Sequence, residues 1–167
     1  KSPGIRYDKE EIMKAVEGGS IITSEMEAFL SLCPSKIIAV TGSDGKTTTT
    51  TLIAKILEAA GKKVWLGGNI GRPLLSEIEN ITPDDFTVLE LSSFQLHTVN
   101  KFENESLPFS RIEFPDVAVC TNVSPNHLNW HIDMDEYTEA KKAIFTYIKE
   151  GGVLVTNIGN DITSNFG

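Results

Sequence analysis

The chain has 167 residues, of which 40% are hydrophobic and 23% charged, as in an ordinary globular protein. Its formal net charge of −8 gives no general attraction to nucleic-acid backbones or anionic membranes, so we exclude both as partners recognised by charge. Cys33 and Cys120 lack metal-ligand spacing and are expected to be reduced thiols. No apolar run has the length of a membrane span, and we expect a cytoplasmic monomer.

Two short helices are predicted before residue 36. Residues 8–16 form the first, with Asp8 as its cap. The second begins at a Ser-x-x-Glu capping box, Ser24 to Glu27, and ends before Pro34. We interpret residues 1–35 as a connector or the tail of a preceding domain.

From Lys36 onward, segments typical of strands and helices alternate. Strands are predicted at residues 37–40, 64–66, 86–91, 117–121 and 153–156. Helices are predicted from Lys46, near Pro73 and from Asp133, where Asp133 and Glu136 form a cap. The first of these helices is expected to bury one face made of Leu52, Ile53, Ile56, Leu57 and Ala60. This alternation predicts an α/β fold, a P-loop-containing mostly parallel sheet with helices on both faces.

A glycine-rich turn joins the first of these strands to the next helix, where a phosphate-binding loop must lie. Its candidate ATP-binding residues are Gly42, Ser43, Asp44, Gly45, Lys46, Thr47 and Thr48. Glycines let backbone N–H groups turn inward, and a helix N-terminus favours anions. Lys46 can pair with the outer phosphates and the Thr47 hydroxyl can bind Mg²⁺. The strict Walker spacing is missed, because Val40 stands where glycine is required; the alternative is a turn with a solvated lysine.

Other polar residues follow strand ends, where ligands of parallel sheets gather. Glu90 lies inside an apolar strand and is a sensible Mg²⁺ ligand beside the loop, or else an outward-facing residue of an edge strand. Asn69 either faces a ligand or holds its turn. His127 either binds metal or substrate or is an ordinary satisfied polar residue. Composition alone gives Lys141 no function, because lysines on helices are usually solvated.

Several segments together resemble the Mur ligase family. The loop at residues 41–49 departs from the Walker spacing in the same way as that family's phosphate loop. The segments Gly-Gly-Asn-Ile-Gly at 67–71 and Leu-Ser-Ser-Phe-Gln-Leu at 91–96 are more specific, and are most similar to the members that attach D-glutamate. Matching segments continue in order at residues 122–128 and 137–141, so the resemblance covers residues 36–161.

The resemblance implies an ATP- and Mg²⁺-dependent ligase that joins D-glutamate to UDP-N-acetylmuramoyl-L-alanine through an acyl phosphate, in peptidoglycan synthesis. It implies that Lys46, His127 and Lys141 are catalytic. It implies metal binding by Thr47, Glu90, His127 and Lys141, the last as a carbamate. It implies that Asn69, Ser92, Gln95 and His127 face the UDP-muramoyl substrate.

The resemblance also implies a domain order. Residues 1–35 would end an N-terminal domain that binds the UDP substrate, and residues 36–167 would form an incomplete central ATP-binding domain. The C-terminal domain would lie outside this chain, so we expect these residues alone to be inactive.

Two departures from the family pattern stand out. Asn126 and Asn129 replace aspartates that many members carry around the histidine, and residues 100–115 form a longer connection, interpreted as a surface excursion.

Three alternatives share parts of this pattern. A folylpolyglutamate synthase-like ligase shares the loop and its chemistry, but residues 67–71 and 91–96 fit it less well. A P-loop NTPase or phosphotransferase explains the loop, yet not the order of His127 and Lys141 downstream. A noncatalytic nucleotide-binding module is the third.

Overall fold

A single parallel sheet organises the protein. The computed structural model describes residues 1–99, 101 and 112–166. Five strands pair in the order β2-β3-β1-β4-β5, all parallel. They are β1 (Lys36–Thr41), β2 (Val64–Gly68), β3 (Phe86–Glu90), β4 (Val117–Cys120) and β5 (Val153–Thr156). The strand segments and parallel sheet predicted from sequence are confirmed.

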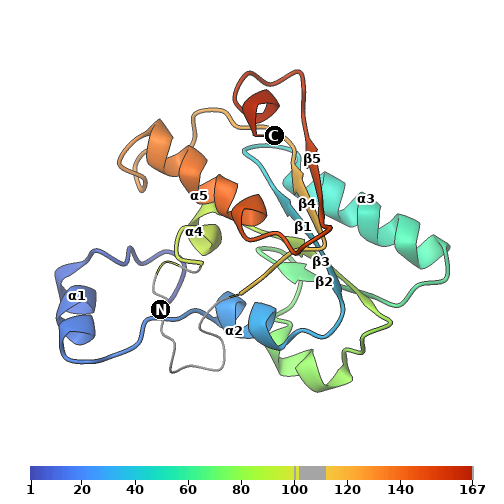
Figure 1. Cartoon of the computed structure of the whole chain (residues 1–167), viewed down its shortest axis with the longest axis horizontal. Helices are drawn as coiled ribbons and strands as arrows, with labels where there is room; N and C mark the ends of the chain where they lie inside the picture. Colours follow the sequence, from blue (N-terminus) through green and yellow to red (C-terminus); the bar gives the residue numbers. More distant parts are fainter. Residues whose placement is uncertain (100, 102–111, 167) are drawn as a thin grey trace.

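Helices cover both faces of this sheet, which confirms the predicted fold class (Figure 1). The connection from β1 runs through α3 (Lys46–Ala59) to the edge strand β2, and the chain returns through the 3-10 helix η1 (Leu75–Asn80). Then α4 (Ser93–Leu96) and α5 (Met134–Thr146) lie on the face opposite α3 (Figure 1). Right-handed crossovers require this arrangement, because the chain moves from β1 to the edge strand β2 in one direction across the sheet and from β2 to β5 in the other. Three short helices complete the described structure: α1 (Glu10–Glu17), α2 (Glu25–Leu32) and η2 (Thr163–Asn165).

The central strands are buried on both sides, as expected for a parallel sheet between helices. In β1 and β3, Ile37, Ala39, Val88 and Leu89 are at most 1% exposed. The strand register aligns the carboxyl ends of β1, β2 and β3, since Glu90 lies opposite Val40 of β1 and Gly68 of β2. The residues that follow β1, β2 and β3 therefore meet at one edge.

Two sequence predictions are wrong. Three of the five residues expected on the buried face of α3 are exposed, namely Leu52 (57%), Ile56 (59%) and Ala60, while Thr50 and Ala54 are buried instead. Apolar spacing cannot choose between two adjacent faces of a helix when both carry aliphatic residues. Asp8 caps no helix: Lys9 is the N-cap of α1, and the Asp8 carboxylate is bonded by Arg6 instead.

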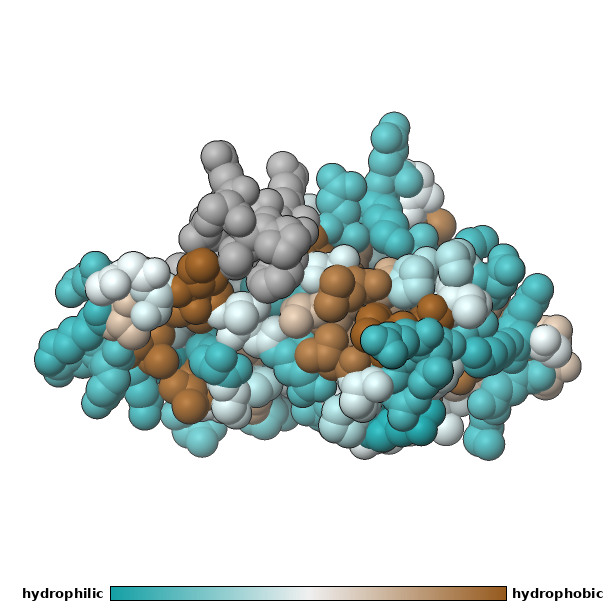
Figure 2. All heavy atoms as spheres, turned by 90° about the horizontal axis from the view of Figure 1, so that it is seen from below, coloured by the Kyte–Doolittle hydropathy of each residue, from teal (hydrophilic) through white to brown (hydrophobic). Residues whose placement is uncertain are grey.

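The predicted caps of α2 and α5 are present, because Ser24 and Asp133 accept the backbone N–H groups of Glu27 and Glu136. The excursion predicted at residues 100–115 falls largely outside the described residues. Hydrophilic residues dominate the surface seen from below, with hydrophobic ones in separate patches (Figure 2). Within the described part of the chain, no helix has both the length and the hydropathy needed to cross a membrane.

Candidate ATP-binding and ligase site

The glycine-rich loop between β1 and α3 is shaped by two glycines with positive φ. Gly42 has φ 149°, and a Cβ there would overlap the Thr121 side chain, so only glycine fits. Gly45 has φ 75° and starts α3, whose first intrahelical bond runs from Thr49 N–H to Gly45 O. The N–H groups of Lys46, Thr47 and Thr48 precede that bond and point out of the helix end. The loop therefore presents the donors and the dipole that favour an anion.

The first half of the loop is fastened to the end of β4. Ser43 N–H donates to Asn122 O at 2.9 Å, and Asp44 N–H donates to Asn122 Oδ1 at 2.9 Å. The Thr121 hydroxyl donates to Asp44 O at 2.6 Å. The backbone N–H groups of Ser43 and Asp44, both predicted to bind ATP, are therefore hydrogen-bonded within the protein. The N–H groups of residues 45–48 are then the ones that can bind phosphate.

Two lysines meet at one carbonyl of this loop. Lys46 Nζ donates to Gly42 O and Ser43 O, each at 2.9 Å, and Lys141 Nζ donates to Gly42 O at 2.8 Å. Lys141 is 1% exposed, contrary to the solvated position that composition alone suggests. Burial, together with the nearby Lys46 cation, lowers the pKa of Lys141 from 10.5 to about 7. Both amines therefore lie beside the loop where phosphates would bind.

Glu90 is held by the two residues predicted to share its site. Its carboxylate is 2% exposed and accepts the Thr47 hydroxyl at 2.7 Å and the Asn69 side-chain amide at 2.9 Å. The edge-strand alternative for Glu90 is excluded, because β3 lies between β1 and β2. A buried carboxylate that touches a loop hydroxyl offers the hard oxygen ligands that Mg²⁺ prefers.

Gly68 allows the close contact between the ends of β2 and β3. It has φ 98°, and a Cβ would overlap the carbonyl of Glu90, which also accepts Asn69 N–H at 2.7 Å. Gly61 has φ 74° but no neighbouring atom within 4 Å, so it is a matched control. We expect Gly61→Ala to lower the free energy of unfolding by about 1–2 kcal/mol through backbone strain. Gly68→Ala should lower it by about 3–5 kcal/mol, since overpacking adds to strain; urea titration measures both, and equal losses would contradict this account.

One pocket of about 230 Å³ brings together five of the predicted site residues. Its lining comprises Lys46, Asn69, Ser92, Ser93, Phe94, His127, Tyr137 and Lys141. His127 has φ 56°, packs against Phe94 with ring centroids 4.8 Å apart, and is exposed. Partial burial and the positive charges of Lys141 and Lys46 lower its pKa, so the imidazole is neutral near pH 7.

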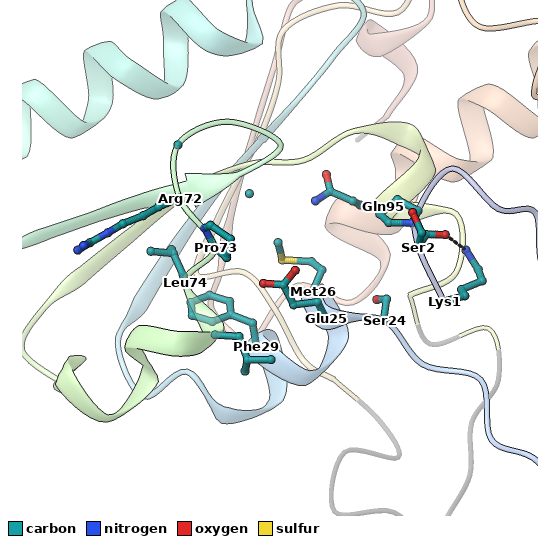
Figure 3. Close-up of a pocket in the computed structure, with 14 residues that line it drawn as sticks. Lys1, Ser2, Ser24, Glu25, Met26, Phe29, Arg72, Pro73, Leu74 and Gln95 are labelled. Carbon is teal, nitrogen blue, oxygen red and sulfur yellow. Dashed lines mark hydrogen bonds between the residues drawn. The ribbon is translucent and has the colours of Figure 1, made fainter.

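Gln95, also predicted to face substrate, lies instead in a second pocket of about 370 Å³. The side-chain oxygen of Gln95 accepts hydrogen bonds from the Ser92 N–H and hydroxyl in a capping box at the start of α4. The Gln95 side chain extends toward Met26 and Pro73 across that pocket (Figure 3). Gln95 therefore lines a different pocket from Asn69, Ser92 and His127, although its side chain is bonded to Ser92.

Sequence reasoning missed Tyr137 and Asn122 as parts of the site. The sequence gives Tyr137 no role beyond its place in the matching segment 137–141, yet its hydroxyl lies 2.9 Å from Ser43 Oγ and it lines the pocket. Asn122 follows β4 directly, so its place at a strand end was an available signal.

A buried histidine beside the pocket predicts a pH effect. His131 is 2% exposed, and burial lowers its pKa from 6.5 to about 4. As pH falls from 6.5 to 4, the unfolded chain binds a proton before the folded one, so stability falls with pH in that window. His131→Gln should remove about 2–3 kcal/mol of this acid-induced loss. Urea titrations between pH 7 and 4 test it, and identical pH slopes for both proteins would refute it.

Comparison with known proteins agrees with this geometry. The family described as Mur ligase middle domain matches residues 40–166. The UDP-N-acetylmuramoylalanine--D-glutamate ligase of Acetivibrio thermocellus is 57% identical over 166 residues, 99% of this chain and 33% of that protein. The ligase of the same name from Clostridium kluyveri is 54% identical over 165 residues, with the same coverage. The chain thus spans about a third of the length of these curated relatives.

Solved structures show the same fold. MurF ligase from Thermotoga maritima in complex with ADP superposes with a TM-score of 0.60 at 25% identity, over 83% of this chain and 33% of that one. UDP-N-acetylmuramate-alanine ligase MurC from the same organism gives a TM-score of 0.61 at 22% identity, over 99% and 36%. Because the family match extends over most of the sequence, as the segments at 41–49, 67–71 and 91–96 predicted, the chain belongs to the Mur ligase family through its middle domain.

Proposed function

We propose that this chain is the ATP-binding part of a cytoplasmic ligase that joins D-glutamate to UDP-N-acetylmuramoyl-L-alanine in peptidoglycan synthesis. The observation that carries the proposal is the convergence of Lys46, His127 and Lys141 on one pocket beside a helix N-terminus. The choice of substrates rests on relatives of that name, 52–57% identical across this chain.

The reaction proceeds in two steps. A carboxylate oxygen of the UDP substrate attacks the γ-phosphorus of ATP, the bond to the ADP oxygen breaks, and an acyl phosphate forms. The D-glutamate amine then attacks the acyl carbon, inorganic phosphate leaves, and the amine loses its proton to give the amide. Both reactants of the first step are anions, so charge compensation dominates the barrier. Lys46 and the N–H groups of residues 45–48 supply that compensation at the phosphates.

The residues around Glu90 fit Mg²⁺. Thr47 and Glu90 already touch through a 2.7 Å hydrogen bond, and Asn69 orients the second carboxylate oxygen. We propose that Thr47 and Glu90 hold the ion, and that Asn69 fixes the carboxylate for it. Bound Mg²⁺ would neutralise phosphate oxygens and polarise the γ-phosphoryl group.

Lys141 fits a metal only after modification, since a buried ammonium repels cations. Its pKa of about 7 leaves much of the amine neutral at physiological pH. A neutral amine adds to the carbon of CO₂, forms an N–C bond and releases a proton, which gives a carbamate anion. We propose that this carbamate and the neutral imidazole of His127 are the ligands of a second metal.

The two adjoining pockets suggest how the UDP substrate lies. Its reacting carboxylate would enter the 230 Å³ pocket, where Asn69, Ser92 and His127 contact it. The neighbouring part of the substrate would occupy the 370 Å³ pocket and meet Gln95. We further propose that residues 1–35 belong to the connection from a UDP-substrate domain, and that the protein acts as a monomer without nucleic-acid or membrane partners.

Phosphate release by the full-length protein tests the proposal. We expect release from ATP to require both UDP-N-acetylmuramoyl-L-alanine and D-glutamate. Replacement of D-glutamate by L-glutamate is the matched control and should abolish turnover. Release that ignores both substrates would overturn the ligase proposal and leave a P-loop NTPase.

A further inference from the structure

Arg6 joins the N-terminal segment to the start of α5. Arg6 donates from its two terminal nitrogens to the two carboxylate oxygens of Glu136, each at 2.9 Å. It also donates to Trp130 O at 2.9 Å and lies over the Trp130 ring, 5.1 Å from its centroid. Both charged side chains are more than four-fifths buried. Such a forked pair fixes orientation as well as distance.

Glu136 is the centre of a wider polar cluster. Its carboxylate also accepts the Ile132 N–H at 2.8 Å and lies 3.1 Å from His97 Nε2. The hydrogen bonds from Arg6 hold the pKa of Glu136 well below its usual range, so it is ionised. With His97 and His131 it has the ligand types of a metal site. However, a dication there would have to displace the Arg6 guanidinium from both oxygens and leave it buried without its partner, so the cluster is better explained as a clamp.

The same turn of α5 reaches the phosphate loop. Tyr137 directly follows Glu136 and bonds Ser43, while Lys141, just over one turn later, bonds Gly42 O. On the other side of the cluster, His131 Nε2 lies 2.9 Å from Ser93 Oγ, next to the pocket residue Ser92. A shift of the first turn of α5 would therefore move two groups that hold the loop.

We infer that Arg6 is a positioning residue of the ligase site: by clamping Glu136, the N-terminal segment sets Tyr137 and Lys141 against the phosphate loop. The kinetic test of this inference rests on the proposed function. The test by nucleotide binding does not depend on it. It couples a segment more than 120 residues distant in sequence to the residues that would receive ATP.

Arg6→Met and Arg6→Lys in the full-length protein test this inference, with Asp8→Asn as the matched control. Asp8 also bonds Arg6, but its side chain is 43% exposed and it does not join the segment to α5. Steady-state kinetics, the Kd for ADP by calorimetry and the melting temperature are measured for each. We expect Arg6→Met to raise the Kd for ADP and lower kcat/KM for ATP by about tenfold. Arg6→Lys should recover part of this loss, because lysine keeps the charge but not the fork, and Asp8→Asn should stay within about twofold.

The double variant, Arg6→Met with Glu136→Gln, shows whether the two residues act through their mutual ion pair or independently of each other. We expect the Kd of the double variant for ADP to be no higher than that of whichever single variant binds ADP more weakly. The reason is that both substitutions disrupt the same Arg6–Glu136 pair. Additive losses would overturn the inference. So would an Arg6→Met protein that melts lower yet keeps its Kd for ADP and its kcat/KM. If the wild-type protein shows no ligase activity, the proposed function fails, and the clamp is then judged on the Kd for ADP alone.

Discussion

Under the proposed function, replacing Lys46 with alanine should lower kcat of the full-length protein by about 100- to 1,000-fold. Its ammonium lies 2.9 Å from two loop carbonyls and lines the pocket, so it can turn to the outer phosphates when ATP binds. Loss of one preorganised donor to developing negative charge costs about 3–4 kcal/mol in transition-state stability. The decrease should appear mainly in kcat, with a smaller rise in KM for ATP.

Lys55→Ala is the matched control for this change. Lys55 lies on the same helix, α3, and is exposed, so its removal should leave the kinetics unchanged. Circular dichroism and melting temperatures verify that both variants fold. A Lys46→Ala enzyme with more than about a tenth of wild-type kcat would refute the phosphate-loop interpretation.

If Lys141 binds the second metal as proposed, its replacement with methionine should cost at least about 100-fold in kcat, the effect of losing a metal-binding group worth several kcal/mol. Folding should survive, because an apolar side chain of similar length replaces a buried ammonium that is costly to desolvate. Carbamylation adds a second expectation: wild-type activity falls in CO₂-depleted buffer and returns with bicarbonate. The residual activity of the variant should not respond to either treatment.

Lys142→Met provides the comparison, since Lys142 neighbours Lys141 on α5 and its side chain contacts the exposed Glu139 and the ring of Phe166. It should keep wild-type kcat and the same response to CO₂. A wild-type enzyme that ignores CO₂ depletion while Lys141→Met is inactive would exclude the carbamate and leave Lys141 as a simple cation.

Much of the fold could be predicted because each strand is a short apolar run closed by glycine or polar residues. Gly67-Gly68 after β2 and Asp133 before α5 mark their boundaries by local chemistry, and local chemistry is readable in sequence. The exposed Leu52 and Ile56 were not predictable, because burial on α3 depends on which part of the sheet the helix crosses. Asp8 does not cap α1, because its carboxylate accepts hydrogen bonds from Arg6 instead of from the backbone N–H groups of the helix.

The site was predictable where topology places a residue at a strand end, as for Glu90 and Asn69, or at the start of the following helix, as for Thr47. It was not predictable where distant segments meet. The sequence around Arg6 does not predict its ion pair with Glu136. The sequence around Gln95 does not predict that its side chain lines a different pocket. The burial of Lys141 likewise depends on packing between α5 and the loop, and only family resemblance pointed to it.

The most direct measurement follows oxygen from the substrate carboxylate. UDP-N-acetylmuramoyl-L-alanine with ¹⁸O in both carboxylate oxygens is incubated with the full-length enzyme, ATP and D-glutamate, and the released phosphate is analysed by mass spectrometry. An acyl phosphate predicts one ¹⁸O in each phosphate and one retained in the amide, with labelled phosphate released about 100- to 1,000-fold more slowly by Lys46→Ala. Unlabelled phosphate would show that water attacks ATP, and would contradict the ligase account.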